Sequence, residues 1–157
     1  MSFITITQYF NKLQIVLFAL LIVPLLGFIA LYFFVSGMPP DPRMEYYIII
    51  PTAVLLDWLV AMIIFNKKIK SARNTQGLGA KLDKYFELTI VRYCIISSSS
   101  FILAVGFYLS KSDFFTAMYL AGLVLSGILW PTGRRVSDDL RLRGDEREMV
   151  YFKKDTF

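Results

Sequence analysis

The sequence of 157 residues contains no histidine and only one cysteine, Cys94. Without histidine the chain offers no bis-histidine haem ligation, no ordinary His-ligated metal site and no histidine acid–base catalysis. A single cysteine provides neither a disulfide framework nor the thiolate spacing of a zinc site. We therefore expect no haem, no metal and no other cofactor.

The chain also lacks the glycine-rich, Walker, nucleophile-elbow and HExxH motifs of common nucleotide-binding and catalytic sites. The acidic pairs Asp138–Asp139 and Asp145–Glu146 could hold a divalent ion, but the arginines between and around them favour a solvated helix surface. No residue can be assigned a catalytic role. We expect that the protein is not an enzyme.

Charged side chains are almost missing from four long stretches. These stretches approach or exceed the roughly 20 helical residues that cross a hydrocarbon core about 30 Å thick. With 56% of all residues hydrophobic, no part of the chain remains for a separate soluble core. The sequence predicts an all-α membrane protein whose domain 1–133 is a bundle of four transmembrane helices, followed by a charged tail, 134–157. The expected spans are about 13–36, 46–65, 93–110 and 114–130.

Amphipathic segments accompany these spans. Apolar residues at helical spacing within 1–12 predict a short interfacial helix at the N-terminus, and the first span resembles a retained signal anchor because no basic start and no A-x-A site are present. A similar pattern after Gly79 predicts a helix in the loop between spans two and three, either on the membrane surface or leading directly into span three. In the tail, Ser137 before two aspartates predicts a helix start, and Gly144 predicts an interruption, giving two short interfacial helices.

The distribution of positive charge predicts the orientation. Lys12, the 66–92 loop and the tail hold 15 of the 17 Lys and Arg residues, and the other connections hold only Arg43 and Lys111. By the positive-inside rule, both termini and the long loop should face the cytoplasm, across an inner or plasma membrane. The same rule accounts for the net charge of +5, so we expect no nucleic-acid partner.

Asp57 is the one carboxylate inside a predicted span. A carboxylate near the bilayer centre costs several kcal/mol on insertion scales and should face protein or water. Ala53 and Ala61 lie on the same helical face, and small residues mark faces where membrane helices pack closely. We expect Asp57 to point into the bundle.

Other unusual groups fall at a similar depth when each residue of helix rises 1.5 Å. Pro24 should kink span one and leave the carbonyl of Leu20 without its helical partner. The serine run 97–100 in span three and the pair Gly122 and Ser126 in span four lie in the same layer, and Arg92 could reach it from below as an ion partner. The predicted polar layer comprises Asp57, Ser97, Ser98, Ser99, Ser100 and Ser126.

Three interpretations of this layer remain open, one of them a contact site for another membrane protein. Asp57 could be protonated or hydrogen-bonded to serines and simply fix the helix register, while serines can also bond back to their own helix. Alternatively, the layer could bind a proton, cation or substrate, because a buried carboxylate is the usual proton-coupling group. Four spans with a single membrane carboxylate resemble small multidrug-resistance exporters in layout. Those exporters carry the acid in the first span and lack a long charged tail, so no residue role follows.

The expected function is that of an accessory or assembly subunit of an inner-membrane complex, with transport of a proton or cation by an oligomer as the alternative. The charged tail, the interfacial segments and the sparse intramembrane chemistry favour the subunit. The expected partners are the lipid bilayer and either other membrane subunits or further copies of the chain. Ala117 with Ala121, and Gly122 with Ser126, have the small-xxx-small spacing that suits such contacts.

Overall fold

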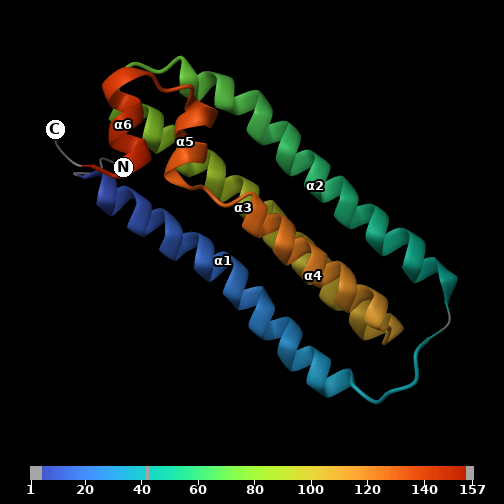
Figure 1. Cartoon of the computed structure of the whole chain (residues 1–157). Coiled ribbons are helices and arrows are strands. Elements are labelled where there is room, and N and C mark those ends of the chain that lie inside the picture. The colour runs from blue at the N-terminus through green and yellow to red at the C-terminus, as the bar shows by residue number, and fades with distance from the viewer. Residues whose placement is uncertain (1–4, 42, 155–157) are drawn as a thin grey trace. The chain divides into compact units, whose positions relative to one another are not determined.

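The computed structural model describes residues 5–41 and 43–154, which form six α-helices joined by short connections (Figure 1). No β-strand occurs in this described part, so the all-α prediction is confirmed there. The three long helices are α1 (Ile6–Val35), α2 (Met44–Arg73) and α3 (Leu78–Ser110), and the three shorter ones are α4 (Asp113–Ile128), α5 (Gly133–Leu140) and α6 (Gly144–Phe152).

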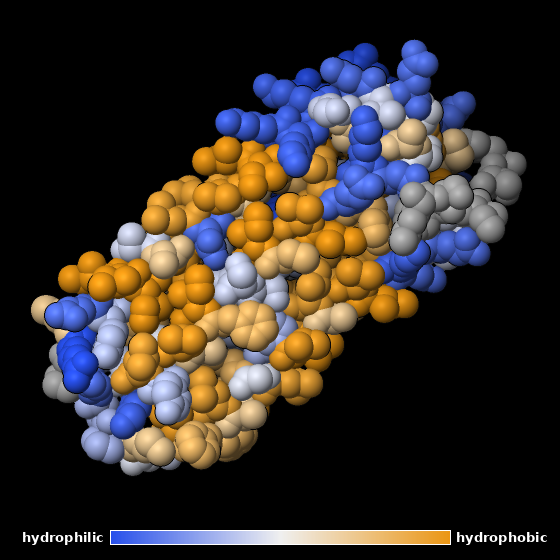
Figure 2. Space-filling view, turned by 180° about the vertical axis from the view of Figure 1, so that it is seen from behind, coloured by the Kyte–Doolittle hydropathy of each residue, from blue (hydrophilic) through white to orange (hydrophobic). Residues whose placement is uncertain are grey.

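Helices α1, α2 and α3 are each long and apolar enough to cross a membrane. Helix α4 has 16 residues and meets the same test only as a bent pair with α5. The described residues therefore contain three candidate spans, or four if the bent pair counts as one. Apolar side chains cover broad areas of the face in Figure 2. Large apolar residues such as Phe33 and Ile15 are exposed, at 75% and 69%. Such a surface suits contact with lipid and supports an integral membrane protein.

The predicted N-terminal interfacial helix is not a separate element in the described residues. Of the two alternatives for the loop helix, the structure has the one that leads directly into span three. Helix α1 is continuous from Ile6 and α3 from Leu78. Neither contains a proline before its apolar segment, and the one glycine there, Gly79, lies in the first turn of α3. Likewise, α2 continues to Arg73 beyond the predicted end at Phe65, because lysine, serine and alanine are compatible with a helix that leaves the apolar layer. Residues 1–4 of the predicted N-terminal helix lie outside the described part.

Contacts divide the chain into two compact units, and each long helix contributes to both. The first unit consists of Met1–Phe18, Met62–Arg92 and Trp130–Phe157. The second consists of Ala19–Ala61 and Tyr93–Leu129. The second unit thus contains most of the apolar residues of the candidate spans, and the first contains most of their charged residues together with the tail.

The core of the second unit is aromatic. Phe28 stacks on Tyr119 with ring centroids 4.1 Å apart. Helices α3 and α4 approach closely at Gly106, where an added Cβ would lie 2.8 Å from the ring of Phe115. The hydrophobic cluster of this unit comprises Phe28, Val35, Ile50, Val54, Leu103, Phe107, Phe115 and Tyr119.

The tail in the first unit is folded and partly buried. Helix α5 begins at Gly133, where Thr132 caps the helix by accepting a hydrogen bond from the Arg135 amide at 3.3 Å. The predicted start at Ser137 is wrong, because this serine is buried inside α5 and its hydroxyl donates to the Gly133 carbonyl at 2.9 Å. The predicted interruption at Gly144 is confirmed, since α6 begins there. The buried apolar residues of the tail are Val136, Leu140, Leu142 and Val150.

Candidate functional site

Asp57 lies half-buried on α2 and faces the serine run of α3. Its carboxylate oxygen Oδ2 is 3.2 Å from the hydroxyl oxygen of Ser98 and 3.2 Å from that of Ser99. All three residues belong to the second unit. Two hydroxyls on one carboxylate oxygen form a small polar cluster between otherwise apolar helices.

Each of these serines also has a second acceptor, the carbonyl of Ile95 in its own helix. Ser98 Oγ lies 2.6 Å and Ser99 Oγ 3.3 Å from that oxygen. A hydroxyl carries one proton, so each serine can donate either to Asp57 or to Ile95. With Asp57 ionised, both hydroxyls can turn to its oxygen. With Asp57 protonated, the carboxyl can donate to one serine while both serines donate to Ile95. The cluster therefore accommodates both protonation states.

Ser97 has a different partner from its neighbours. Proline at position 24 of α1 cannot donate a hydrogen bond to the carbonyl of Leu20, one turn earlier. The Ser97 hydroxyl donates to this carbonyl oxygen at 3.0 Å and so replaces the missing backbone donor. This bond joins α1 to α3 at the predicted kink.

The remaining members of the predicted layer do not join the Asp57 cluster. In the described part of the chain, Ser100 is half-buried and forms no hydrogen bond with Asp57. Ser126 is buried, and its hydroxyl donates to the Gly122 carbonyl at 2.8 Å within α4. The Ser126 carbonyl in turn accepts a hydrogen bond from the Tyr93 hydroxyl at 2.8 Å. The layer thus divides into separate helix-to-helix links.

Arg92 lies in the first unit and is 2% exposed. Its guanidinium carbon is 4.1 Å from the centroid of the Phe65 ring, a cation–π distance. An ion pair between Arg92 and Asp57 stays a prediction.

Trp58, next to Asp57 in sequence, was not identified as a site residue. Its indole Nε1 is buried and has no hydrogen-bond partner among the described residues. The ring fills the space beside Gly122, where an added Cβ would lie 3.1 Å from it. In the pair Gly122 and Ser126, the glycine therefore packs against a helix of its own chain. A buried donor without an acceptor is unfavourable by about 1–3 kcal/mol, and it marks a place where a water or another acceptor would be stabilised.

A second polar cluster, also missed from sequence, holds the tail in the first unit. Arg73 Nε donates to the backbone carbonyl of Asp139 at 2.6 Å, and the Tyr85 hydroxyl donates to the Asp139 carboxylate at 2.9 Å. Lys81 Nζ pairs with the Glu146 carboxylate at 2.7 Å. These partners lie 54 to 66 residues apart in sequence, and no local motif indicates them.

Burial raises the pKa of the Tyr85 hydroxyl, and the nearby Asp139 carboxylate raises it further. Tyr85 precedes the apolar segment of α3 and lies outside the predicted span. The hydroxyl therefore stays protonated at physiological pH and remains a hydrogen-bond donor to Asp139.

Comparison of the chain with protein-family models, with curated proteins and with solved structures finds no match. Within the described residues, no group of three or more His, Cys, Asp or Glu side chains is placed to hold a metal ion. The two polar clusters are therefore interpreted from their own geometry.

Proposed function

We propose that this chain is an accessory or assembly subunit of a complex in an inner or plasma membrane, with the tail and the 66–92 segment in the cytoplasm. The main support for the proposal is the folded and anchored structure of the tail. Helices α5 and α6 form a folded, charged structure that is fastened to α2 and α3 through Asp139 and Glu146. A tail needed only to set the orientation would not require such anchoring.

The outer side of the tail supports a docking role. The side chains of Arg134, Asp138 and Arg147 are 77%, 57% and 56% exposed. Their mutual ion pairs, at 4.0 and 3.8 Å, are exposed and contribute at most about 1 kcal/mol each. These charges can therefore exchange their present partners for those of another subunit, and a folded platform loses little conformational entropy on binding.

Purification of the tagged chain from native membranes without crosslinking tests the proposal. We expect other membrane proteins to co-purify at fixed stoichiometry, and the double variant Arg134→Glu/Arg147→Glu to lose them. The matched control is Arg43→Glu, an exposed arginine in the connection between α1 and α2, predicted to lie on the opposite side of the membrane. A chain that purifies alone, or companions retained by the double variant, would contradict the docking role.

The Asp57 cluster favours a second candidate, a small oligomeric transporter coupled to protons or cations. The support is that Ser98 and Ser99 can serve both the ionised and the neutral carboxyl. A carboxyl whose two protonation states are both accommodated is suited to taking up and releasing a proton.

Flux measurements in proteoliposomes separate this candidate from the subunit. A transporter loses proton or cation flux in Asp57→Asn and keeps it in Ser100→Ala, whose hydroxyl does not bond Asp57. If Asp57→Asn alters thermal stability alone, the transport role is excluded.

A further inference from the structure

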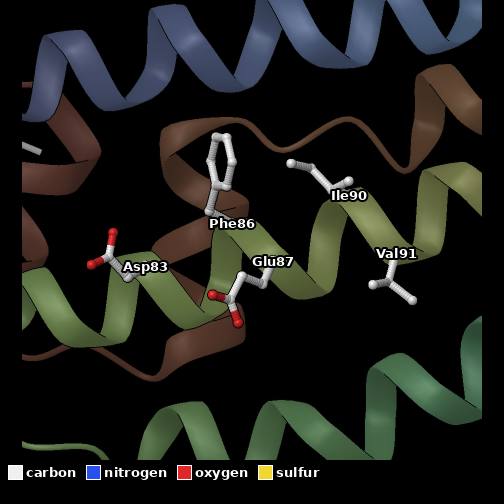
Figure 3. A pocket seen from close by; sticks show the side chains of 5 residues that line it. All are labelled: Asp83, Phe86, Glu87, Ile90 and Val91. Carbon is white, nitrogen blue, oxygen red and sulfur yellow. The ribbon is translucent and has the colours of Figure 1, made fainter. Parts of the chain in front are cut away.

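The first unit contains a hollow on α3 that the proposed function does not use. Its volume is about 290 Å³, and its lining combines the carboxylates of Asp83 and Glu87 with an apolar surface (Figure 3). Phe86 points toward α1. Its ring packs edge-on against that of Tyr9, with the two ring centroids 6.0 Å apart. The apolar part is completed by Ile90 and Val91. This lining suits an apolar group that carries a positive charge at one end.

Helix α2 presents a stripe of that composition. The apolar residues Leu56, Val60 and Ile63 are 56%, 46% and 50% exposed, and Lys67 and Lys70 are exposed below them. The spacing of four, three, four and three residues places all five on one face of the helix. The stripe is thus apolar within the predicted span and basic just beyond its end.

The basic end of the stripe and the hollow lie at matching depths. Lys70 follows the end of the apolar segment of α2, Phe65, by five residues, or about 7.5 Å of helix. Glu87 precedes the start of the apolar segment of α3, Tyr93, by six residues, or about 9 Å. Lys67 and Val91 are each two residues, about 3 Å, from the same boundaries. In two chains inserted in the same direction, Lys70 of one and Glu87 of the other therefore lie at similar depths in the membrane, and so do Lys67 and Val91.

Glu87 of the hollow and the two lysines of the stripe have no ion-pair partner in the described part of one chain. Among the described residues, Glu87, Lys67 and Lys70 are exposed and form no ion pair with one another or with other side chains. Anionic lipid headgroups are an unfavourable alternative occupant, because the hollow carries two carboxylates. A second copy of the chain supplies lysines at the required depth and is present wherever the first copy is.

The geometry points to a symmetric pair of chains in which the basic end of the α2 stripe of each copy, Lys67 and Lys70, lies in the α3 hollow of the other. Lys70 of one copy pairs with Glu87 of its partner, and the aliphatic part of Lys67 lies beside Val91. The contact is isologous, so both halves form together. The pairing does not depend on the tail or on Asp57, and it holds for a subunit as well as for a transporter.

Disulfide trapping in native membranes provides the first test. In a Cys94→Ser background, copies with Lys67→Cys and copies with Val91→Cys carry different tags and are co-expressed, so a disulfide between them joins two chains. We expect a crosslink carrying both tags. The matched control replaces Lys67→Cys with Lys68→Cys, which lies on another face of α2. A crosslink equally strong in the control overturns the assignment.

A charge exchange provides the second test, with association measured by energy transfer between labelled chains in lipid vesicles. Lys70→Glu and Glu87→Lys should each lower the association constant about tenfold, because two ion pairs become two repulsions. A mixture of the two variants should recover wild-type association, since one pair in the mixed dimer is native and the other is reversed. Recovery also shows that both variants are folded.

The two tests decide the proposal without reference to co-purification or flux. A wild-type chain that stays monomeric in vesicles overturns it. Unchanged association in both single variants, or a mixture that does not recover, also overturns it.

Discussion

At the scale of single residues, the structure links a proline in one helix to a serine in another. Pro24 leaves the Leu20 carbonyl without its backbone donor, and Ser97 supplies a hydroxyl at 3.0 Å. An unsatisfied carbonyl in lipid has no water to accept a hydrogen bond from. The contribution of Ser97 to stability should therefore depend on the presence of Pro24.

A double-mutant cycle measures this dependence. Ser97→Ala should lower the free energy of unfolding by about 0.6 kcal/mol and by no more than about 1.7 kcal/mol, the range of hydrogen bonds between membrane helices. In a Pro24→Ala background the restored amide can bond to Leu20, so the same serine substitution should have a smaller effect. Ser100→Ala is the control. Additive effects in a reversible unfolding assay would show that the two sites are not coupled.

The types of polar group at the candidate site can be predicted from the sequence, but their individual hydrogen-bond partners cannot. A single carboxylate in an apolar helix predicts an inward-facing group, and equal depth points to the serine run of α3. Depth alone does not assign partners, because the position of each serine around the helix and its side-chain rotamer decide which acceptor the hydroxyl reaches. Ser98 and Ser99 thus contact Asp57, Ser97 contacts Leu20, and Ser126 bonds within α4.

At the scale of helices, close packing is set by small residues. An added Cβ at Gly106 would lie 2.8 Å from the buried ring of Phe115 and 3.0 Å from the side chain of Ile50. Gly106→Ala should therefore destabilise the fold by about 1–3 kcal/mol, as overpacking does. Gly27→Ala, with open space around it, should be neutral or slightly stabilising. Melting temperatures in detergent compare the two, and equal values would contradict the packing.

The contact between α5 and α6 gives a second prediction at this scale. A Cβ at Gly133 would lie 2.7 Å from the backbone carbonyl oxygen of Val150, which cannot rotate away. Gly133→Ala should separate the two tail helices and speed proteolysis of the tail, while α1 to α3 remain protected. Gly79→Ala, also near a helix start but with nothing within 4 Å, is the control. Equal cleavage rates in both variants would argue against the contact.

The helices themselves could be predicted more reliably than their ends. Long apolar stretches predict α1, α2 and α3, because only a helix satisfies its own backbone in lipid. Their ends are harder to predict because polarity does not end a helix. Lys67 and Lys68 mark the expected end of span two, yet α2 continues to Arg73. The tail was harder still, because its anchors on Tyr85 and Lys81 are distant in sequence.

At the scale of the whole molecule, the distribution of lysine and arginine predicts one orientation. A cysteine at Met38, between α1 and α2, should react with a membrane-impermeant thiol reagent from outside the cell. A cysteine at Gly79, in the first turn of α3, should react only after the membrane is opened. Both are placed in a Cys94→Ser background. Labelling of the Met38 position from the cytoplasmic side alone would reverse the orientation.

The anchoring of the tail also has a consequence for biosynthesis. Arg73, Lys81 and Tyr85 are made roughly 55 to 65 residues before their partners, as the sequence separations show. During translation the ends of α2 and α3 therefore lack these partners until α5 and α6 have left the ribosome. A chain that stops before α5 would retain its apolar spans and insert, but it would expose a bare tyrosine and two unpaired cations. Such a surface would let quality-control proteases distinguish truncated chains from those that carry the tail.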